Sequence, residues 1–404
     1  MERVYISGAC RTPIGKVGGI LSGKSATELG AVVIAEAVKR VGLNPKMVEH
    51  VFMGCVIQAG LGQNVARQAA IRAGLPVTTT AETINTVCGS SLECVNLAAN
   101  MIRCGDADIV IAGGTESMSN APFAVMQARF GYYMGYPTKH SELVDTMVND
   151  ALWDAFNNVH MGITAENIVK QWKLTREEMD SFALASYQKT RFAMESGAFR
   201  EEIVPVAVKQ KNQTMFIDMD ERTHLGMTTE SLAKLKPVFD PEGAVTAGNS
   251  TGINDGAAAI VLISEKKCRE LGIKPQAQWI GGALGGVEPS IMGIGPIEST
   301  RKLLKKLNMT MDDIDLVEGN EAFAAQSIVV QRELHIPSEK LNVNGGAIAL
   351  GHPVGASGCR ILVTLVHAMK KRNARNGLAM LCIGGGMGCT TIIRNCEENF
   401  INER

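Results

Sequence analysis

The most reactive setting for a side chain in this sequence is that of Cys88, which ends an extended run and precedes a helix-like segment. That helix would begin within residues 89–91, so its free N–H groups and its dipole would favour the thiolate and lower the pKa of Cys88 from about 8.5. A cysteine activated in this way is a candidate nucleophile for covalent catalysis. Considered alone, however, a Cys-Gly-Ser turn is more often structural.

A second candidate is His352, which lies within residues 342–358, a seventeen-residue loop that is rich in glycine. Gly351 and Pro353 flank the histidine, so the backbone rather than side-chain packing would fix the direction of the imidazole. The glycines also let a substrate approach the backbone closely. A lone histidine is usually structural, but this loop favours a general acid or base.

Two further strand ends carry polar or reactive groups. Cys382 ends a strand and precedes Gly384 and two more glycines, whose N–H groups could form an anion-binding nest. The alternatives are a phosphate-cradling loop, for which the Walker lysine is missing, or a simple turn. Asn320 follows another strand and could orient a water or donate to an oxyanion, while Glu321 could cap the next helix. Capping alone would also explain this polar pair.

The elements that must position these residues alternate between β-branched runs and amphipathic segments. This alternation predicts an α/β fold with buried parallel strands. Strands are predicted at residues 4–9, 51–56, 109–112, 259–263, 314–317, 378–383 and 390–393, and helices at residues 27–41, 91–103, 298–307 and 358–372.

Two of these segments look alike. Residues 107–114 and 378–386 are each a buried strand that runs into glycines after a long helix. A duplicated α/β half explains the similarity, although a strand followed by glycines also recurs by chance in α/β proteins. Residues 120–247 are instead polar, aromatic and Met-rich, with amphipathic helices such as residues 176–196. We interpret them as an excursion from the first half, whose sheet resumes at residues 257–263.

Composition excludes several classes of protein. The chain has 404 residues, 40 basic and 41 acidic side chains, and a net charge of −1. This balance argues against a nucleic-acid partner, and no apolar run approaches the ~18 residues of a membrane span. Because a strand-like run starts at once, we expect no targeting leader and a cytoplasmic protein. The ten cysteines form no Cys-x-x-Cys pair, so no metal centre is expected, and most of the eight besides Cys88 and Cys382 should be small buried hydrophobes.

Taken together, these segments resemble the thiolase family over essentially the whole chain, and the biosynthetic acetoacetyl-CoA thiolases most of all. The resemblance runs from Arg11-Thr12-Pro13 to the final glycine-rich turn, and the motifs around His352 and Cys382 are its most specific parts. It implies two duplicated α/β halves packed in five layers (αβαβα) with an inserted loop domain. The implied boundaries are residues 1–120 for the N-terminal half, completed by 248–274, 121–247 for the loop domain and 275–404 for the C-terminal half.

The resemblance also implies an activity, the reversible Claisen condensation of two acetyl-CoA to acetoacetyl-CoA and CoA. Cys88 would carry the acetyl group, His352 would exchange protons with Cys88 and with the departing CoA, and Cys382 would deprotonate the second acetyl-CoA. His352 and a water held by Asn320 would stabilise the enolate oxygen. The N–H groups of Cys88 and Gly384 would stabilise the tetrahedral oxyanion. No metal or redox cofactor is implied, and the coenzyme A thioesters are substrates.

By the same resemblance, coenzyme A would be bound by residues that supply apolar walls and hydrogen bonds: Leu152, His160, Met161, Arg222, His224, Ala247, Thr251, Ala322 and Phe323. Whether Arg222 or His224 contacts the nucleotide stays open, because His224 stands in a stretch where relatives often supply an arginine. Met161 would fill the acyl pocket and favour short chains. The family implies a homodimer or homotetramer, and residues 123–137, rich in Met, Tyr and Phe, are a candidate contact between dimers.

Three other interpretations stay open. A 3-ketoacyl-(acyl carrier protein) synthase would share the fold and a cysteine nucleophile but lack a base of the Cys382 type. A 3-ketoacyl-CoA thiolase of broader chain length would differ in its kinetics, and a non-catalytic carrier would have lost Cys88, His352 or Cys382. A further hypothesis concerns redox control: if Cys88 and Cys382 serve one reacting carbon with lowered pKa values, their sulfurs could close a regulatory disulfide.

Overall fold

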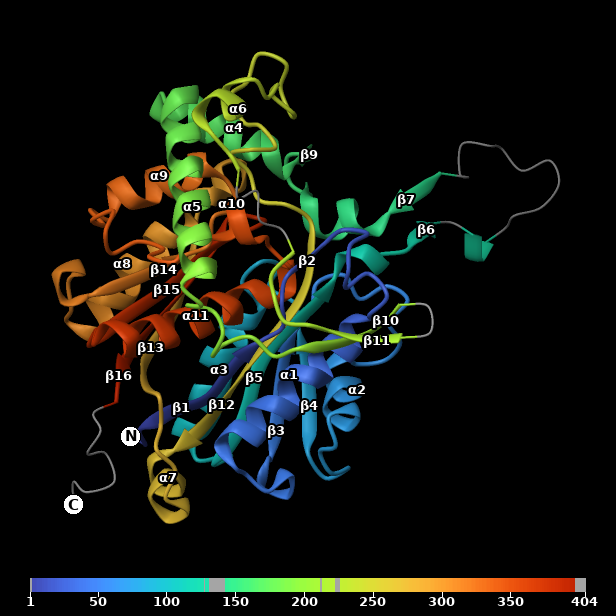
Figure 1. Ribbon diagram of the computed structural model, residues 1–404, viewed down its shortest axis with the longest axis vertical. Helices are drawn as coiled ribbons and strands as arrows, with labels where there is room; N and C mark the ends of the chain where they lie inside the picture. Colours follow the sequence, from blue (N-terminus) through green and yellow to red (C-terminus); the bar gives the residue numbers. More distant parts are fainter. Residues whose placement is uncertain (1, 127, 131–141, 211–212, 222–225, 397–404) are drawn as a thin grey trace.

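The computed structural model describes residues 2–126, 128–130, 142–210, 213–221 and 226–396. Within these residues one continuous ten-stranded sheet consists of two similar parts, the first and the second sheet, which lie in the two halves of the molecule (Figure 1). The first has the strand order β4 (Thr80–Ile84), β3 (His50–Gly54), β5 (Ile109–Ser117), β12 (Asn254–Ser264) and β1 (Val4–Arg11). The second has the order β14 (Leu316–Gly319), β15 (Asn376–Ile383), β16 (Met387–Asn395) and β13 (Ala277–Gly286).

The two sheets repeat one topology. In the first, β3 pairs parallel with β5, which continues antiparallel to β12 and then to β1. In the second, β14 pairs parallel with β15, which continues antiparallel to β16 and then to β13. Strands β5 and β15 therefore occupy equivalent positions, and they contain the two similar stretches of sequence. The predicted duplication of the fold is confirmed. A short pairing of β1 with β13 joins the two sheets edge to edge.

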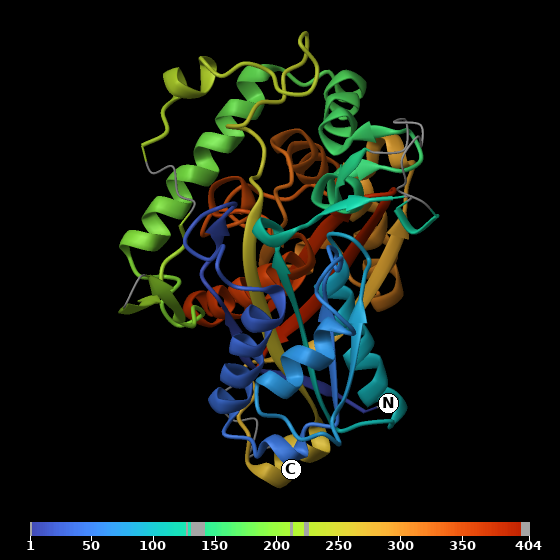
Figure 2. The same ribbon diagram turned by 90° about the vertical axis from the view of Figure 1, so that its right-hand side faces the viewer.

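The helices complete a five-layered arrangement. Helices α3 (Ser90–Cys104) and α11 (Ser357–Arg372) lie between the sheets and contact strands of both halves (Figures 1 and 2). The largest hydrophobic core lies here, because α3 and α11 bury side chains against each other and against both sheets. Helices α1 (Ala26–Val41) and α2 (Val65–Arg72) cover the outer face of the first sheet, and α8 (Gly295–Leu307) covers that of the second, with α9 (Ala324–Glu333) beside it.

The local sequence explains where these helices begin and end. Ser25 and Glu28 form a capping box at the start of α1, which ends at the left-handed Gly42. Helix α8 begins three residues before its predicted start, because Pro296 stands in its first turn, where the missing N–H of proline costs nothing. Glu321 does not cap the next helix as predicted. That helix, α9, begins after Phe323, and Gln326 closes its first turn instead.

The excursion between β5 and β12 is built from helices and short hairpins. Its helices are α4 (Met161–Trp172), α5 (Arg176–Glu195) and α6 (Thr229–Ala233). Its hairpins pair β6 (Phe123–Val125) with β7 (Leu143–Asp145), β8 (Trp153–Asp154) with β9 (Val159–His160), and β10 (Val206–Gln210) with β11 (Gln213–Ile217). Since β5 and β12 are neighbours in the sheet, the excursion leaves the first half intact. The domain boundaries given above stay a prediction.

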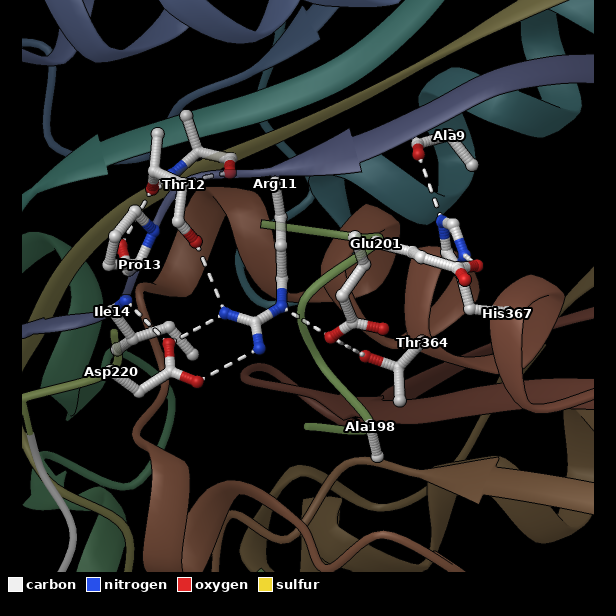
Figure 3. Close-up of polar contacts among 12 residues, drawn as sticks. Ala9, Arg11, Thr12, Pro13, Ile14, Ala198, Glu201, Asp220, Thr364 and His367 are labelled. Atoms are coloured by element: carbon white, nitrogen blue, oxygen red, sulfur yellow. Dashed lines mark hydrogen bonds and ion pairs between the residues drawn. The ribbon is translucent and has the colours of Figure 1, made fainter. Parts of the chain in front are cut away.

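A buried ion cluster around Arg11 fastens the excursion to the two-sheet body (Figure 3). Arg11 ends β1, and its Nη1 and Nη2 donate to the two carboxylate oxygens of Asp220 at 2.6 and 2.9 Å. Its Nε donates to Glu202 Oε1 at 2.7 Å, and the same oxygen accepts from Thr364 Oγ1 of α11 at 3.1 Å. Because a buried guanidinium is costly unless it is paired, these contacts fix β1, α11 and the excursion relative to one another.

Within the described ranges, no helix is both long and apolar enough to cross a bilayer.

Candidate active site

Cys88 stands at a strained turn between β4 and α3. Val87, a β-branched residue, has a left-handed φ of 43°, a conformation that such side chains rarely adopt. The Asn85 side chain accepts from the Val87 N–H at 3.0 Å, and Ser90 Oγ donates to the Val87 carbonyl at 2.6 Å. Strain of this kind persists where the surrounding contacts enforce it, and it marks Cys88 as a candidate functional residue.

The Cys88 sulfur is a thiol at rest. The Gly384 N–H, on the turn after β15 of the other half, is close enough to the Cys88 sulfur to act to lower the pKa of this thiol. Burial nevertheless raises the pKa of Cys88 to about 11, because the N–H groups of Gly384 and Cys88 offset only part of the desolvation. The predicted lowering of this pKa is therefore wrong. The N–H groups at the helix start are present, but the sulfur is buried, so a base must remove the proton.

Cys382 lies beside Cys88, at the end of β15. Its side chain is fully buried in a small apolar cluster with Met161, Ala322 and Phe323. Burial, and then the charge of Cys88, raise the pKa of Cys382 well above its usual value, which shows that the two sulfurs are near one another. The predicted lowering is wrong here also. Both cysteines are free, and the disulfide between them stays a prediction.

His352 is held by its backbone and by one ring nitrogen. Its N–H donates to Asn254 Oδ1 at 3.0 Å, and its Nδ1 contacts Ser357 Oγ. Since the Ser357 hydroxyl donates to the Pro353 carbonyl at 2.8 Å, it accepts from Nδ1, which assigns the proton to Nδ1. Nε2 then keeps its lone pair, and within the described residues it has no hydrogen-bond partner.

The same imidazole is neutral. Burial, followed by the positive charge of Arg360, lowers the pKa of His352 to about 3. A neutral ring with a free Nε2 can accept a proton, which is the capacity that the buried thiol of Cys88 requires.

Asn320 presents an unused amide. It follows β14, and its N–H donates to the Met380 carbonyl on β15 at 2.9 Å, which brings it to the strand of Cys382. Among the described residues, neither its Oδ1 nor its Nδ2 has a partner, although the side chain is buried. A closed cavity of about 10 Å³, lined by Asn320, Asn342 and Met380 among others, is just large enough for one water.

Several of the predicted coenzyme A residues gather beside this site. The Thr251 N–H donates to the Ala322 carbonyl at 3.0 Å, and Thr251 Oγ1 donates to the Ala347 carbonyl at 2.9 Å. These bonds bring Thr251 and the exposed Ala247 next to Ala322 and to α10 (Ala347–Leu350), just before His352. Leu152 packs, half-buried, against the main core. Arg222 and His224 lie outside the described residues, as does most of the second half of residues 123–137.

Sequence reasoning missed Phe239. The His160 ring stacks on Phe239 with centroids 4.7 Å apart, and Phe239 meets the Phe323 ring edge-on at 6.2 Å. Gly162 makes this possible, because a Cβ there would lie 2.2 Å from the Phe239 ring. Phe239 is more than seventy residues from both His160 and Phe323, so no local pattern could have connected it with them.

Across the part of the chain that the structure describes, no group of three or more His, Cys, Asp or Glu side chains could hold a metal ion.

The duplicated five-layered fold, with a cysteine from each half at one buried site, is the arrangement expected of a thiolase. Two family descriptions match the chain, "Thiolase, N-terminal domain" over residues 4–266 and "Thiolase, C-terminal domain" over residues 273–395. The chain therefore belongs to the thiolase family.

Individual relatives are similar over almost the whole length. The acetyl-CoA acetyltransferase of Syntrophomonas wolfei is 54% identical over 394 residues, which cover 97% of this chain and 99% of that protein. That of Pseudomonas aeruginosa is 53% identical over 389 residues, covering 96% and 98%. The crystal structure of the Bacillus anthracis acetyl-CoA acetyltransferase superposes with a TM-score of 0.95 at 43% identity, covering 98% of this chain and 99% of that one. Human mitochondrial 3-ketoacyl-CoA thiolase superposes with a TM-score of 0.94 at 40% identity and the same coverage.

Proposed function

We propose that this protein is an acetyl-CoA acetyltransferase, which condenses two acetyl-CoA reversibly to acetoacetyl-CoA and CoA through an acetyl-Cys88 intermediate. The observation that carries the proposal is the proximity of the buried Cys88 to Cys382 and to the Gly384 N–H, each of which acts on a cysteine pKa at this site. This proximity joins a candidate nucleophile of one half to the glycine turn that follows Cys382 of the other. The activity named for the relatives from S. wolfei and P. aeruginosa supports the same reaction.

In the first step the Cys88 sulfur attacks the thioester carbon of acetyl-CoA while Nε2 of His352 accepts the thiol proton. The N–H groups of Cys88 and Gly384 stabilise the tetrahedral oxyanion. The oxyanion then collapses, the bond from the acetyl carbon to the CoA sulfur breaks, and the CoA thiolate takes the proton from His352. The free lone pair on Nε2 supports this role for His352.

In the second step Cys382 removes a proton from the methyl group of a second acetyl-CoA. The resulting carbanion attacks the acetyl carbon on Cys88, the bond from that carbon to the Cys88 sulfur breaks, and acetoacetyl-CoA forms. The released Cys88 thiolate then takes the proton from Cys382, which restores the Cys88 thiol and the Cys382 thiolate that acts as the base. A water held by Asn320, together with His352, stabilises the enolate oxygen. The unpartnered amide of Asn320 supports this assignment. The raised pKa of Cys382 fits both directions of the reaction. In condensation the Cys382 thiolate is a strong base, and in cleavage the Cys382 thiol is the acid that returns a proton to the acetyl-CoA carbanion.

Coenzyme A is proposed to bind along Leu152, His160, Met161, Ala247, Thr251, Ala322 and Phe323, with Arg222 or His224 at its nucleotide end. The stack of His160, Phe239 and Phe323 supports an apolar wall for the neutral pantetheine arm. We propose short acyl chains, since Met161 borders the turn of Gly384: a Cβ built on Gly384 would be in van der Waals contact with the Met161 sulfur, at 3.5 Å. The structural similarity to human mitochondrial 3-ketoacyl-CoA thiolase makes a broader chain-length range the second candidate.

Two measurements test the proposal. After incubation with acetyl-CoA, peptide mass spectrometry should find the acetyl group on Cys88, and an acetyl group on Cys382 instead would reverse the two roles. Thiolysis kinetics then decide the chain length. We expect kcat/KM to fall about tenfold or more for each two carbons added to acetoacetyl-CoA, since a single methylene in a tight pocket is worth about 1–3 kcal/mol.

Assembly and location are also proposals. We propose a cytoplasmic homodimer or homotetramer that uses no cofactor. The β6–β7 hairpin extends away from the body of the molecule (Figure 1) and carries the exposed side chains of Phe123 and Leu143, with Met126 just beyond β6. Such an exposed apolar group supports a contact between subunits. Light scattering of the intact protein, compared with a variant that carries Ser at Phe123 and Leu143, tests this contact.

A further inference from the structure

Two buried carboxylates contact the loop of His352, residues 342–358, one on each side of the histidine. Glu116 belongs to β5 of the first half and contacts the loop at Gly355, three residues after His352. Glu321 follows β14 of the second half and contacts the loop at Ile348, four residues before His352. Both side chains are almost fully buried, and neither is used in the chemical steps described above.

Glu116 joins this loop to the turn after β3. Its Oε2 accepts from the Gly355 N–H at 2.9 Å and from the Val56 N–H at 3.0 Å. Its Oε1 accepts from the Ile57 N–H at 3.2 Å, and the Cys55 thiol donates to the same oxygen at 3.6 Å. One carboxylate therefore accepts hydrogen bonds from two segments that lie about 300 residues apart in sequence.

Glu321 makes a similar set of contacts on the other side. Its Oε2 accepts from Ser186 Oγ of α5 at 2.7 Å and from the Ile348 N–H at 3.1 Å. Its Oε1 accepts from Asn342 Nδ2, at the start of the loop, at 2.7 Å. Helix α5, the second sheet and the loop thus meet at this one side chain.

The glycines of the loop are required by these contacts. A Cβ at Gly355 would lie 2.7 Å from Glu116 Oε2, and a Cβ at Gly346 would lie 2.2 Å from the Glu321 carboxyl carbon. Neither approach is possible for a residue with a side chain unless the carboxylate moves. The glycine richness that first marked this loop is thus explained at two positions by carboxylates rather than by substrate.

We propose that Glu116 and Glu321 are positioning residues, which hold the loop from both halves so that Nε2 of His352 faces the Cys88 thiol. This inference rests on the proposed role of His352 as the base for Cys88. A buried carboxylate is costly unless several donors meet it, and here the donors come both from the loop of His352 and from other segments, so each carboxylate ties the loop to one half of the molecule. Misplacing a base by about 1 Å slows a reaction about 100-fold, whereas substrate binding by other residues is unaffected.

The test compares Glu116→Gln and Glu321→Gln with a matched control, Glu202→Gln. Glu202 is equally buried, but its hydrogen bonds go to Arg11 and Thr364 and, within the described residues, none goes to the loop. Three quantities are measured on the full-length protein: the single-turnover rate of Cys88 acetylation by acetyl-CoA, the KM for acetoacetyl-CoA, and the thermal unfolding midpoint. Gly355→Ala, which pushes on Glu116 without removing it, is the second variant if Glu116→Gln does not fold.

We expect the two loop variants to acetylate Cys88 about 10–100-fold more slowly, with KM within about twofold of the wild type. Glu202→Gln should lower the unfolding midpoint and keep the acetylation rate within about twofold. Wild-type acetylation rates in the folded loop variants, or losses equal to those of Glu202→Gln at equal destabilisation, would overturn the proposal. His352→Ala is measured in parallel. If it acetylates Cys88 at the wild-type rate, the role of His352 itself is wrong, whatever the glutamate variants do.

Discussion

The surroundings of two buried arginines, Arg11 and Arg360, differ. We call the Arg11 cluster the frame, and the surroundings of Arg360, Asn320 and His352 the reacting region. Every nitrogen of the Arg11 guanidinium donates to a protein oxygen, from Asp220, Glu202 or the Thr12 carbonyl. Burial acts to lower the pKa of Arg11, but the two carboxylates more than offset it, so the pKa is raised. Around Arg360, in contrast, no guanidinium nitrogen has a hydrogen-bond partner among the described residues, and burial lowers its pKa.

The difference extends to the neighbours of each arginine. Glu318 lies two residues before Asn320 and interacts electrostatically with Arg360, yet both of its carboxylate oxygens also lack partners in the described part of the chain. The same holds for the Asn320 amide and for Nε2 of His352. Around Arg11 most polar atoms are paired, with Glu202 Oε2 as an exception, whereas the side chains of Arg360, Glu318 and Asn320 have no hydrogen-bond partner among the described residues. Several of the unpartnered buried polar groups thus lie in the region where the chemistry is proposed, although others, such as Ser7, His50 and Thr190, are not used in the proposed chemistry.

The largest expected effect is at the nucleophile. Cys88→Ala should lower the condensation rate by about 10⁴-fold or more, because no other group can carry the acetyl intermediate. Radiolabelled acetyl-CoA should then leave no label on the protein. Residual covalent acetylation of a folded variant would contradict the division drawn above, since it would place a second nucleophile at the site.

His352→Ala should slow Cys88 acetylation by about 10²–10⁴-fold, the usual range for loss of a general base. The pH dependence sharpens this prediction. Since the pKa of His352 is lowered to about 3, the imidazole stays neutral as the pH falls from 8 to 5. The acetylation rate of the wild type should therefore show no loss with an apparent pKa near 6.5 in that range. A rate that titrates near 6.5 would mean that His352 is solvated in solution.

A substitution in the frame should lower the free energy of unfolding and leave the reaction rate nearly unchanged. Asp220→Asn leaves the buried Arg11 with one carboxylate partner, and loss of one partner from a buried ion pair costs about 3–5 kcal/mol. Urea unfolding should show this loss, while kcat for the folded fraction stays within about twofold of the wild type. A variant that keeps its stability but loses activity would show that the Arg11 cluster belongs to the reacting region.

The last expected effect concerns the pH dependence of stability that Glu318 causes. Burial raises its pKa from the usual 4.5 to about 8. Between these values the folded protein keeps a proton that the unfolded chain has lost, so this group makes the wild type less stable as the pH rises from 4.5 to 8. Glu318→Gln removes the effect. Relative to the wild type, the variant should therefore gain stability through this window, by at most about 1.4 kcal/mol per pH unit. Denaturant midpoints at pH 5 and pH 8 measure the difference, and a pH-independent difference would contradict it.

Local signals in the sequence were sufficient for the α/β class and its duplication, but not for strand direction, since β5, β12 and β1 pair antiparallel where parallel strands were predicted. The strand–glycine stretches at residues 107–114 and 378–386 predicted a duplication, and they are β5 and β15 at equivalent positions of two sheets. Helix α11 was predicted within one residue of its start because apolar periodicity and a polar last turn are properties of neighbours three and four apart. The segments of Cys88, His352 and Cys382 could be singled out in the same way, because a cysteine or histidine next to glycines is a local pattern.

The sequence by itself thus singled out the segments of the proposed site, but only the tertiary structure decided the protonation state of their side chains. The pKa values of Cys88 and Cys382 were predicted to be lowered, and burial raises both, because desolvation depends on every atom packed around a sulfur. The contacts of Glu116 with Gly355 and the stacking of Phe239 on His160 likewise join residues that are far apart along the chain. Such contacts follow from how two sheets and an excursion pack together, and no pattern within a short stretch of sequence encodes them.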